Sequence, residues 1–133
     1  MQGEKELGSL LKKLKPILNE GDYVFSNQKD INECDFNNIL MFFKEQEGIT
    51  IILTQEEADR QQLEYSFIAK WITLAVHSSL AAVGLTAAFS KALTEEDISC
   101  NVVAGYFHDH IFVDKKDALK AMKVLNRISE QKQ

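Results

Sequence analysis

The stretch of residues 67–113 constrains the fold of this 133-residue chain more than any other part. It begins with an alternating segment typical of a strand and continues with apolar residues at helical spacing. Two further apolar segments, separated by turn residues, predict a hairpin, and a second helical pattern follows. Strand, helix, hairpin and helix in this order predict a ferredoxin-like α+β unit. The predicted segments are 67–77 (strand), 79–93 (helix), 98–106 and 110–113 (hairpin strands), and 114–128 (helix, with Asp114 as N-cap).

Both faces of the predicted strand 67–77 are apolar. Because side chains alternate along a strand, Ile72 and Leu74 would lie on one face and Trp71 and Ala75 on the other. A sheet face of this kind is not left in water, so we expect both faces to be covered. Helices would cover one face, and the first half of the chain or another subunit would cover the other.

The first half of the chain gives weaker signals. A leucine stripe predicts a helix from Leu7 to Leu18 that Pro16 ends or bends, and residues 23–25 predict a short strand. Residues 26–38 are polar and predict a loop, 39–43 and 49–53 predict a hairpin, and Thr54 with Glu57 predicts a capped helix to about Leu63. We therefore expect two degenerate copies of one α+β unit that share strands, divided as residues 1–63 and 64–133.

Composition excludes several classes of protein. The chain is 45% hydrophobic and 26% charged with a formal net charge of −5, which argues against a nucleic-acid-binding protein. Residues 71–90 contain no Asp, Glu, Lys or Arg, but polar residues at the centre of this segment argue against a membrane span. Cys34 and Cys100 are far apart in the sequence, which favours reduced thiols in a cytoplasmic protein.

Several motifs of the second half resemble those of the ACT domain, the amino-acid-sensing module attached to aspartate kinases and many biosynthetic enzymes. Gly84-Leu85 opens the helix, Ile98-Ser-Cys-Asn101 leads into a strand, and Ile111-Phe-Val113 ends the hairpin. The whole chain is most similar to small stand-alone bacterial ACT-domain proteins of uncharacterised function. The resemblance implies a regulatory, allosteric module that binds a small ligand, an amino acid, and forms a dimer or larger homo-oligomer.

Two features depart from the ACT pattern. Asp97 occupies the helix-to-strand turn where glycine is usual, and Asp adopts left-handed turn geometry more readily than most residues. An ACT unit also closes with a fourth strand after its second helix, and the second half of this chain has no such strand. We expect the first half or a partner chain to supply it.

The predicted ligand site lies at the corner between the strand 67–77 and the following helix. Free backbone N–H groups at a helix start favour a carboxylate. We expect this corner to lie near residues 99–101, so that polar side chains orient the rest of a small zwitterion. A helix cap and a satisfied strand edge explain the same polar residues without a ligand. The predicted site consists of His77, Ser78, Ser79, Leu80, Val83, Gly84, Leu85, Asn101 and Val102.

Two alternatives remain open at this level, a metal site and a structural interaction module. His108, Asp109 and His110 at the hairpin could bind a metal, although His77 is expected at the opposite end of the sheet. A structural protein–protein interaction module without ligand would cover its Trp71 face with a partner. Catalysis finds little support, because Cys100 is expected to be buried and no nucleophile elbow or phosphate loop is present. No cofactor is expected, and the leading interpretation is a non-enzymatic sensor.

Overall fold

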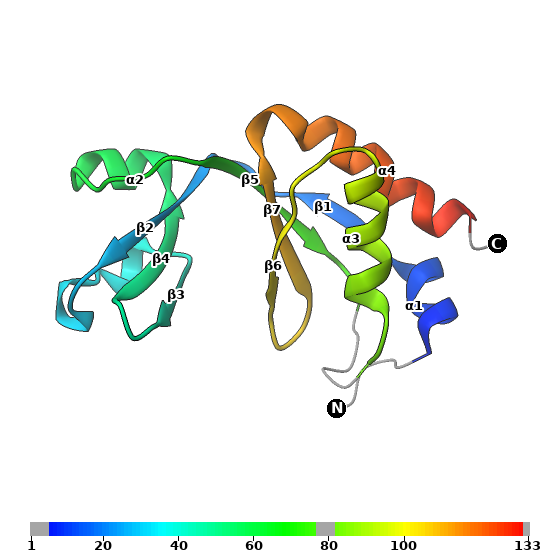
Figure 1. The fold of residues 1–133 in the computed structure, drawn as a ribbon, viewed down its shortest axis with the longest axis horizontal. Helices are drawn as coiled ribbons and strands as arrows, with labels where there is room; N and C mark the ends of the chain where they lie inside the picture. Colours follow the sequence, from blue (N-terminus) through cyan, green and yellow to red (C-terminus); the bar gives the residue numbers. More distant parts are fainter. Residues whose placement is uncertain (1–5, 77–81, 132–133) are drawn as a thin grey trace. The chain divides into compact units, whose positions relative to one another are not determined.

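A computed structural model describes residues 6–76 and 82–131 of the chain (Figure 1). The chain forms two compact units. Residues 1–19 together with 70–133 form one, here called the terminal unit, and residues 20–69 form the other, here called the inserted unit. The predicted boundary after residue 63 concerns two modules of the sequence and stays a prediction. The compact units are divided differently, because residues 1–19 belong with the second half of the chain.

The terminal unit contains an antiparallel sheet whose strands follow the order β1–β5–β7–β6. In the ferredoxin-like order these strands are the fourth, first, third and second, so the predicted α+β fold is confirmed. Three helices accompany the sheet (Figure 1). The elements are α1 (Leu7–Lys13), β1 (Pro16–Leu18), β5 (Ile68–Leu74), α3 (Leu85–Glu95), β6 (Asn101–Ala104), β7 (Asp109–Asp114) and α4 (Ala118–Gln131).

The missing fourth strand is β1, which comes from the first half of the chain. Pro16 pairs with Leu74 and Leu18 with Ile72 in an antiparallel register. The prediction of a helix as far as Leu18 is therefore wrong: α1 ends at Lys13, and Pro16 opens a strand. Proline lacks the backbone N–H that a helix interior needs, but the first residue of a strand tolerates it.

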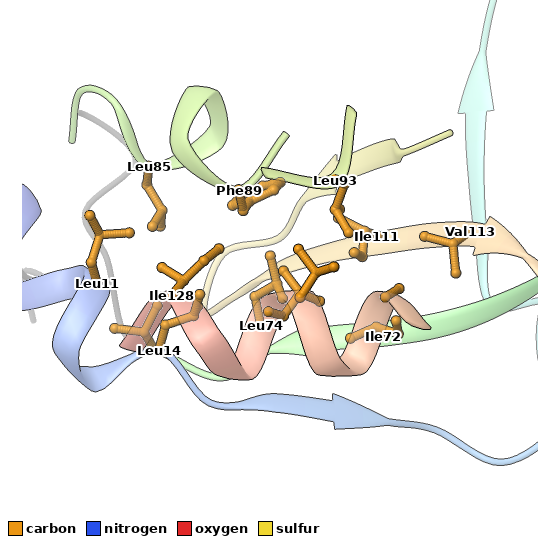
Figure 2. Close-up of a cluster of buried hydrophobic side chains, with 14 of the residues drawn as sticks. Leu11, Leu14, Ile72, Leu74, Leu85, Phe89, Leu93, Ile111, Val113 and Ile128 are labelled. Atoms are coloured by element: carbon orange, nitrogen blue, oxygen red, sulfur yellow. The ribbon is translucent and has the colours of Figure 1, made fainter. Parts of the chain in front are cut away.

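The core of the terminal unit lies between one sheet face and the three helices. Ile72 and Leu74 of β5 and Ile111 and Val113 of β7 point into this core. Figure 2 shows these side chains meeting leucines of α1, Phe89 and its neighbours on α3, and Ile128 of α4. Helices therefore cover one face of the sheet, as the alternation in β5 predicts. None of the described helices is both long and apolar enough to span a bilayer.

The inserted unit repeats the same strand order. Its sheet runs β3–β4–β2–β5, which is second, third, first and fourth in the ferredoxin-like order. The predicted hairpin is present as β3 and β4, and Thr54 Oγ1 accepts the Glu57 N–H at 3.2 Å, so the cap is also present. Two short 3-10 turns stand where the first helix of a full unit would be. The elements are β2 (Tyr23–Gln28), turns Ile31–Glu33 and Phe36–Asn38, β3 (Met41–Lys44), β4 (Ile49–Thr54) and α2 (Gln55–Arg60).

Strand β5 contributes residues to both units. Ile68 and Ala69 pair with Val24 and Tyr23 of β2 and so provide the fourth strand of the inserted unit. The remaining residues of β5 form the first strand of the terminal unit. The expected strand sharing is thus present: the start of β5 completes the sheet of the inserted unit, and β1 from the first half completes the sheet of the terminal unit.

The turn between α3 and β6 has the expected left-handed residue. Asp97 has φ 60°, and its N–H donates to the Thr94 carbonyl at 2.9 Å. The Ile98 N–H then reaches back to the Leu93 carbonyl at 3.0 Å. A left-handed residue after a helix turns the chain back, so that the next N–H groups can bond to the last carbonyl groups of the helix, as they do here.

We expect Leu10→Ala to lower the free energy of unfolding by about 2–5 kcal/mol, the usual cost of removing a fully buried leucine. Leu10 is 0% exposed and fixes α1 onto the core of the terminal unit. Urea denaturation followed by circular dichroism measures the change. Leu119→Ala is the matched control, because Leu119 is 73% exposed, and its effect should stay within about 0.5 kcal/mol. Equal effects of the two substitutions would contradict the placement of α1.

Candidate functional site

The corner between β5 and α3 holds three of the predicted site residues, namely Val83, Gly84 and Leu85. Gly84 has φ 99° and stands at the N-cap of α3, and as a glycine it has no side chain to accept the N–H groups of the first turn. The Ala88 N–H donates to the Gly84 carbonyl at 2.9 Å and so begins the helical bonding. Val83 is 82% exposed and Leu85 is buried in the core. His77, Ser78, Ser79 and Leu80 lie outside the described residues.

Helix α1 packs against this corner. A Cβ atom built on Gly84 would lie 3.1 Å from Leu7 Cδ2, closer than ordinary van der Waals contact. A side chain at position 84 would therefore meet both an unfavourable backbone conformation and a crowded neighbour. Both the backbone conformation and the crowding favour glycine at position 84. This residue has no side chain that could cover the backbone at the start of α3.

Asn101 and Val102 do not lie beside Gly84, contrary to the placement expected from the sequence. They begin β6, which follows the far end of α3, and the 11 residues of α3 span about 16 Å. The physical reason is the direction of the strands. Both β5 and β6 are antiparallel to β7, so they run parallel to each other. The start of β6 is therefore at the other end of the sheet from the end of β5. The Asn101 amide donates to the Phe112 carbonyl at 3.2 Å.

The hairpin between β6 and β7 is what approaches the corner. His108 Nδ1 lies 3.5 Å from the carbonyl oxygen of Val76, the last described residue before the corner. The sequence predicts the hairpin tip at the opposite end of the sheet from His77. His77 lies outside the described residues, but the tip lies close to Val76, at the end of the sheet where β5 ends. Asp109 is half-buried, and burial raises the pKa of its carboxyl group despite the opposing effect of His110.

A hydrogen-bonded cluster joins Asn19, directly after β1, to β5 and β7. It lies on the face of the terminal sheet that no described helix of this unit covers, here called the helix-free face. The Trp71 indole N–H donates to His110 Nδ1 at 3.0 Å, and Thr73 Oγ1 lies 3.2 Å from the same nitrogen. The Asn19 amide donates to Thr73 Oγ1 at 2.9 Å and to the Trp71 carbonyl at 3.2 Å. The sequence predicts that the first half of the chain or another subunit covers this face, and the cluster was not predicted. Trp71 and Thr73 are two residues apart and so share one strand face, which is the sequence feature that could have indicated it.

The Trp71 bond determines the proton position on His110. An indole N–H only donates, so His110 Nδ1 must present a lone pair and the neutral ring carries its proton on Nε2. Burial lowers the pKa of His110, the positive charge of His108 lowers it further, and Asp109 acts in the opposite direction. The folded chain therefore favours neutral His110.

This arrangement gives little support to a metal site at the hairpin. His110 Nδ1 is already engaged by Trp71, and His108 Nδ1 faces a backbone carbonyl. Within residues 6–76 and 82–131, no group of three His, Cys, Asp or Glu side chains is placed to hold a metal ion.

The two cysteines are unpaired thiols. Burial raises the pKa of Cys100 to about 11, with a weaker opposing effect of a hydrogen bond to Ser90. Burial also raises the pKa of Cys34, assisted by Glu33 and Asp30. A thiolate is the reactive form, so both thiols are poor nucleophiles at neutral pH.

The inserted unit has two surface hollows. One, of about 710 Å³, lies between β2 and the segment after α2, where Ser26 Oγ donates to the Glu64 carbonyl at 2.7 Å. The other, of about 610 Å³, lies at the start of α2 and is lined by Asp22, Glu56 and Asp59 among others. Neither contains a predicted site residue.

Comparison with known proteins identifies the relatives of this chain. Two family models, each described as an ACT domain, match residues 2–70 and residues 66–127. A solved structure from Vibrio cholerae, a protein of unknown function described as a possible transport protein, is 44% identical. The match covers 94% of this chain and 97% of that protein's chain, with a TM-score of 0.85. Among curated proteins, none matches this chain.

Two more distant structures share the fold. Protein Atu0741 from Agrobacterium tumefaciens is 16% identical with a TM-score of 0.64, and 87% of this chain and 89% of that chain are covered. The ligand-free regulatory subunit of aspartate kinase from Thermus thermophilus is 7% identical with a TM-score of 0.61. The match covers 85% of this chain and 95% of that subunit.

We expect the Trp71–His110 bond to make stability depend on pH. The pKa of His110 is lower in the folded chain than the ordinary value of about 6.5, so the unfolded chain binds the proton more readily. The stabilising contribution is complete above about pH 6.5 and is lost as pH falls through this value toward the folded pKa. Urea denaturation between pH 5.5 and 8 measures the loss.

The control for this prediction is His110→Gln, which keeps an acceptor for the indole but does not titrate. Its stability should vary less across the same pH range. The chain has one tryptophan, so the fluorescence of Trp71 reports the same event directly. An unchanged pH dependence in His110→Gln would show that another group is responsible.

Proposed function

The chain belongs to the ACT domain family, and from this premise we propose that it is a non-enzymatic regulatory module that binds an amino acid at the corner between β5 and α3. The family and its aspartate kinase neighbours support a regulatory amino-acid-binding module in general. The finer statement, the position of the ligand, is supported by the geometry of the α3 start. Two reduced thiols favour the cytoplasm as its location.

The observation that carries the proposed ligand position is the bare N-terminus of α3. The N–H groups of the first helical turn have no acceptor within the helix, and Gly84 offers no side chain to cap them. The positive end of the helix dipole adds to the attraction for an anion. A carboxylate at this position would accept these N–H groups. The role predicted from the sequence for residues 77–80 stays a prediction, because they lie outside the described residues.

The role proposed for Asn101 and Val102 needs a second copy of the chain. Within one copy they lie at the other end of α3 from Gly84. Strand β6 is the edge of the terminal sheet, and residues 101–107 contain no charged side chain. Antiparallel pairing of β6 with β6 of a second copy would bring each Asn101 toward the partner's hairpin tip. In this homodimer the site combines Gly84 of one copy with Asn101 of the other.

Sensing a metabolite pool calls for micromolar to millimolar affinity, about −4 to −8 kcal/mol. A ligand shared between two copies shifts the assembly by binding one arrangement more tightly than the other. The regulatory output is then a change in association, with this chain or with another protein.

We expect at least one of the proteinogenic amino acids to raise the melting temperature by a few degrees at millimolar concentration. A ligand at ten times its Kd stabilises the folded state by about 1.4 kcal/mol. Gly84→Ala should abolish the shift, because it strains the backbone at φ 99° and places a methyl group against Leu7. A thermal-shift screen of all twenty amino acids measures both effects.

Gly21→Ala is the matched control for backbone strain. Gly21 has φ 100°, almost identical to that of Gly84, but it belongs to the inserted unit. It should lower the melting temperature by a similar amount while leaving the ligand-induced shift intact. If no amino acid shifts the wild-type melting temperature, the proposed function is wrong.

Subunit complementation tests the shared site. Asn101→Ala and Gly84→Ala should each weaken binding when present in both copies. Their mixed dimer contains one intact site and one doubly altered site, so calorimetry should find binding restored at half the wild-type stoichiometry. Binding that stays lost in the mixed dimer would place Asn101 outside the site.

A further inference from the structure

Strand β3 forms an open edge of the inserted sheet. Within the described residues it pairs only with β4, in a register that places Phe43 opposite Thr50. The Glu45 N–H donates to the Gly48 carbonyl at 2.9 Å and closes the hairpin. Because bonded pairs alternate along an antiparallel ladder, the backbone groups of Phe42 and Lys44 point away from β4. They are available to one more strand.

Aromatic side chains are exposed on both faces of this edge. Phe42 is 41% exposed, and its ring centroid lies 5.1 Å from that of Phe36, which is 51% exposed. Phe42 lies opposite the buried Ile51, so this pair continues the core of the inserted unit out to the edge. Phe43 lies on the other face and is 63% exposed. Edge strands in soluble proteins usually avoid apolar exposure of this kind.

The inserted unit is strongly acidic. Residues 20–69 carry 11 Asp and Glu against 3 Lys and Arg, a formal charge of −8. The remaining residues carry 9 acidic and 12 basic side chains, a formal charge of +3. Five of the acidic residues are close to β3 in the sequence, against two lysines. These acidic residues are Asp30, Glu33, Asp35, Glu45 and Glu47.

We propose that β3 is a docking edge for an extended, basic segment of a partner protein, which pairs with β3 as an additional strand. Main-chain hydrogen bonds to Phe42 and Lys44 would provide the pairing, as in other cases of strand addition. Apolar side chains of the segment would cover Phe42 on one face and Phe43 on the other. Basic side chains would be attracted by the acidic surroundings, and the rate of association would depend on salt.

A second copy of the chain fits this edge less well than a basic partner. Pairing β3 with itself would bring together two units of charge −8, and like charges oppose association. The proposal is independent of the amino-acid site, because β3 belongs to the inserted unit and Gly84 to the terminal unit. Either proposal can fail without affecting the other.

The test uses a fluorescein-labelled ten-residue peptide of alternating lysine and valine, with fluorescence anisotropy as the measurement. The peptide should bind the full chain, and raising the salt from about 50 to 300 mM should weaken binding several-fold. The same peptide N-methylated at every residue has no backbone N–H on either edge, so it cannot pair fully with β3 and should bind at least about tenfold more weakly. A glutamate–valine peptide tests the charge and should not bind. Equal binding of these three peptides would overturn the proposal.

Two substitutions locate the binding edge on the protein. Phe43→Ser removes an exposed ring without changing the backbone, and Phe42→Pro removes an N–H that points away from β4. Each should weaken peptide binding about tenfold or more, with circular dichroism confirming the fold. Tyr106→Ser is the control, because Tyr106 is 70% exposed on the terminal unit. Unchanged binding in Phe43→Ser, or a dimer of the wild-type chain that Phe43→Ser dissociates, would overturn the proposal.

Discussion

The pairing of β1 with β5 is the interaction on which the terminal unit depends. Three residues, from Pro16 to Leu18, supply the strand that the second half of the sequence lacks. The same connection places α1 over the core, where Leu10, Leu11 and Leu14 are buried against the other helices. The segment from α1 to β1 is therefore part of the unit that carries the candidate ligand site. The inserted unit in turn takes its fourth strand from the start of β5.

The helix-free face of the terminal sheet combines apolar and polar contacts. Trp71 stacks over Phe112 with ring centroids 6.4 Å apart and also donates to His110. The cluster ties Asn19, directly after β1, to β5 and β7. His110 is the titratable group of this cluster, and burial lowers its pKa below the ordinary value. This face and the bare start of α3 are different parts of the same unit, with different chemistry.

The order of elements in the second half could be predicted from its periodicity, because strand alternation and helical spacing are local properties. The left-handed turn at Asp97, the cap at Thr54 and the hairpin of β3 and β4 also follow from local sequence. The candidate site itself stays a prediction. Gly84 marks the start of α3 by its backbone conformation, whereas the expected neighbourhood of Asn101 was wrong because a helix of 11 residues separates the two ends of the sheet.

The sequence by itself thus determined which segments are strands and helices, which faces are apolar, and which family the motifs resemble. Only the tertiary structure decided which strand completes each sheet, because pairing between distant segments leaves no periodic signal. It also decided that the hairpin tip, with His108, approaches the corner after β5, and that Trp71 finds an acceptor in His110. These contacts depend on the directions in which strands run, and direction is a property of the assembled sheet.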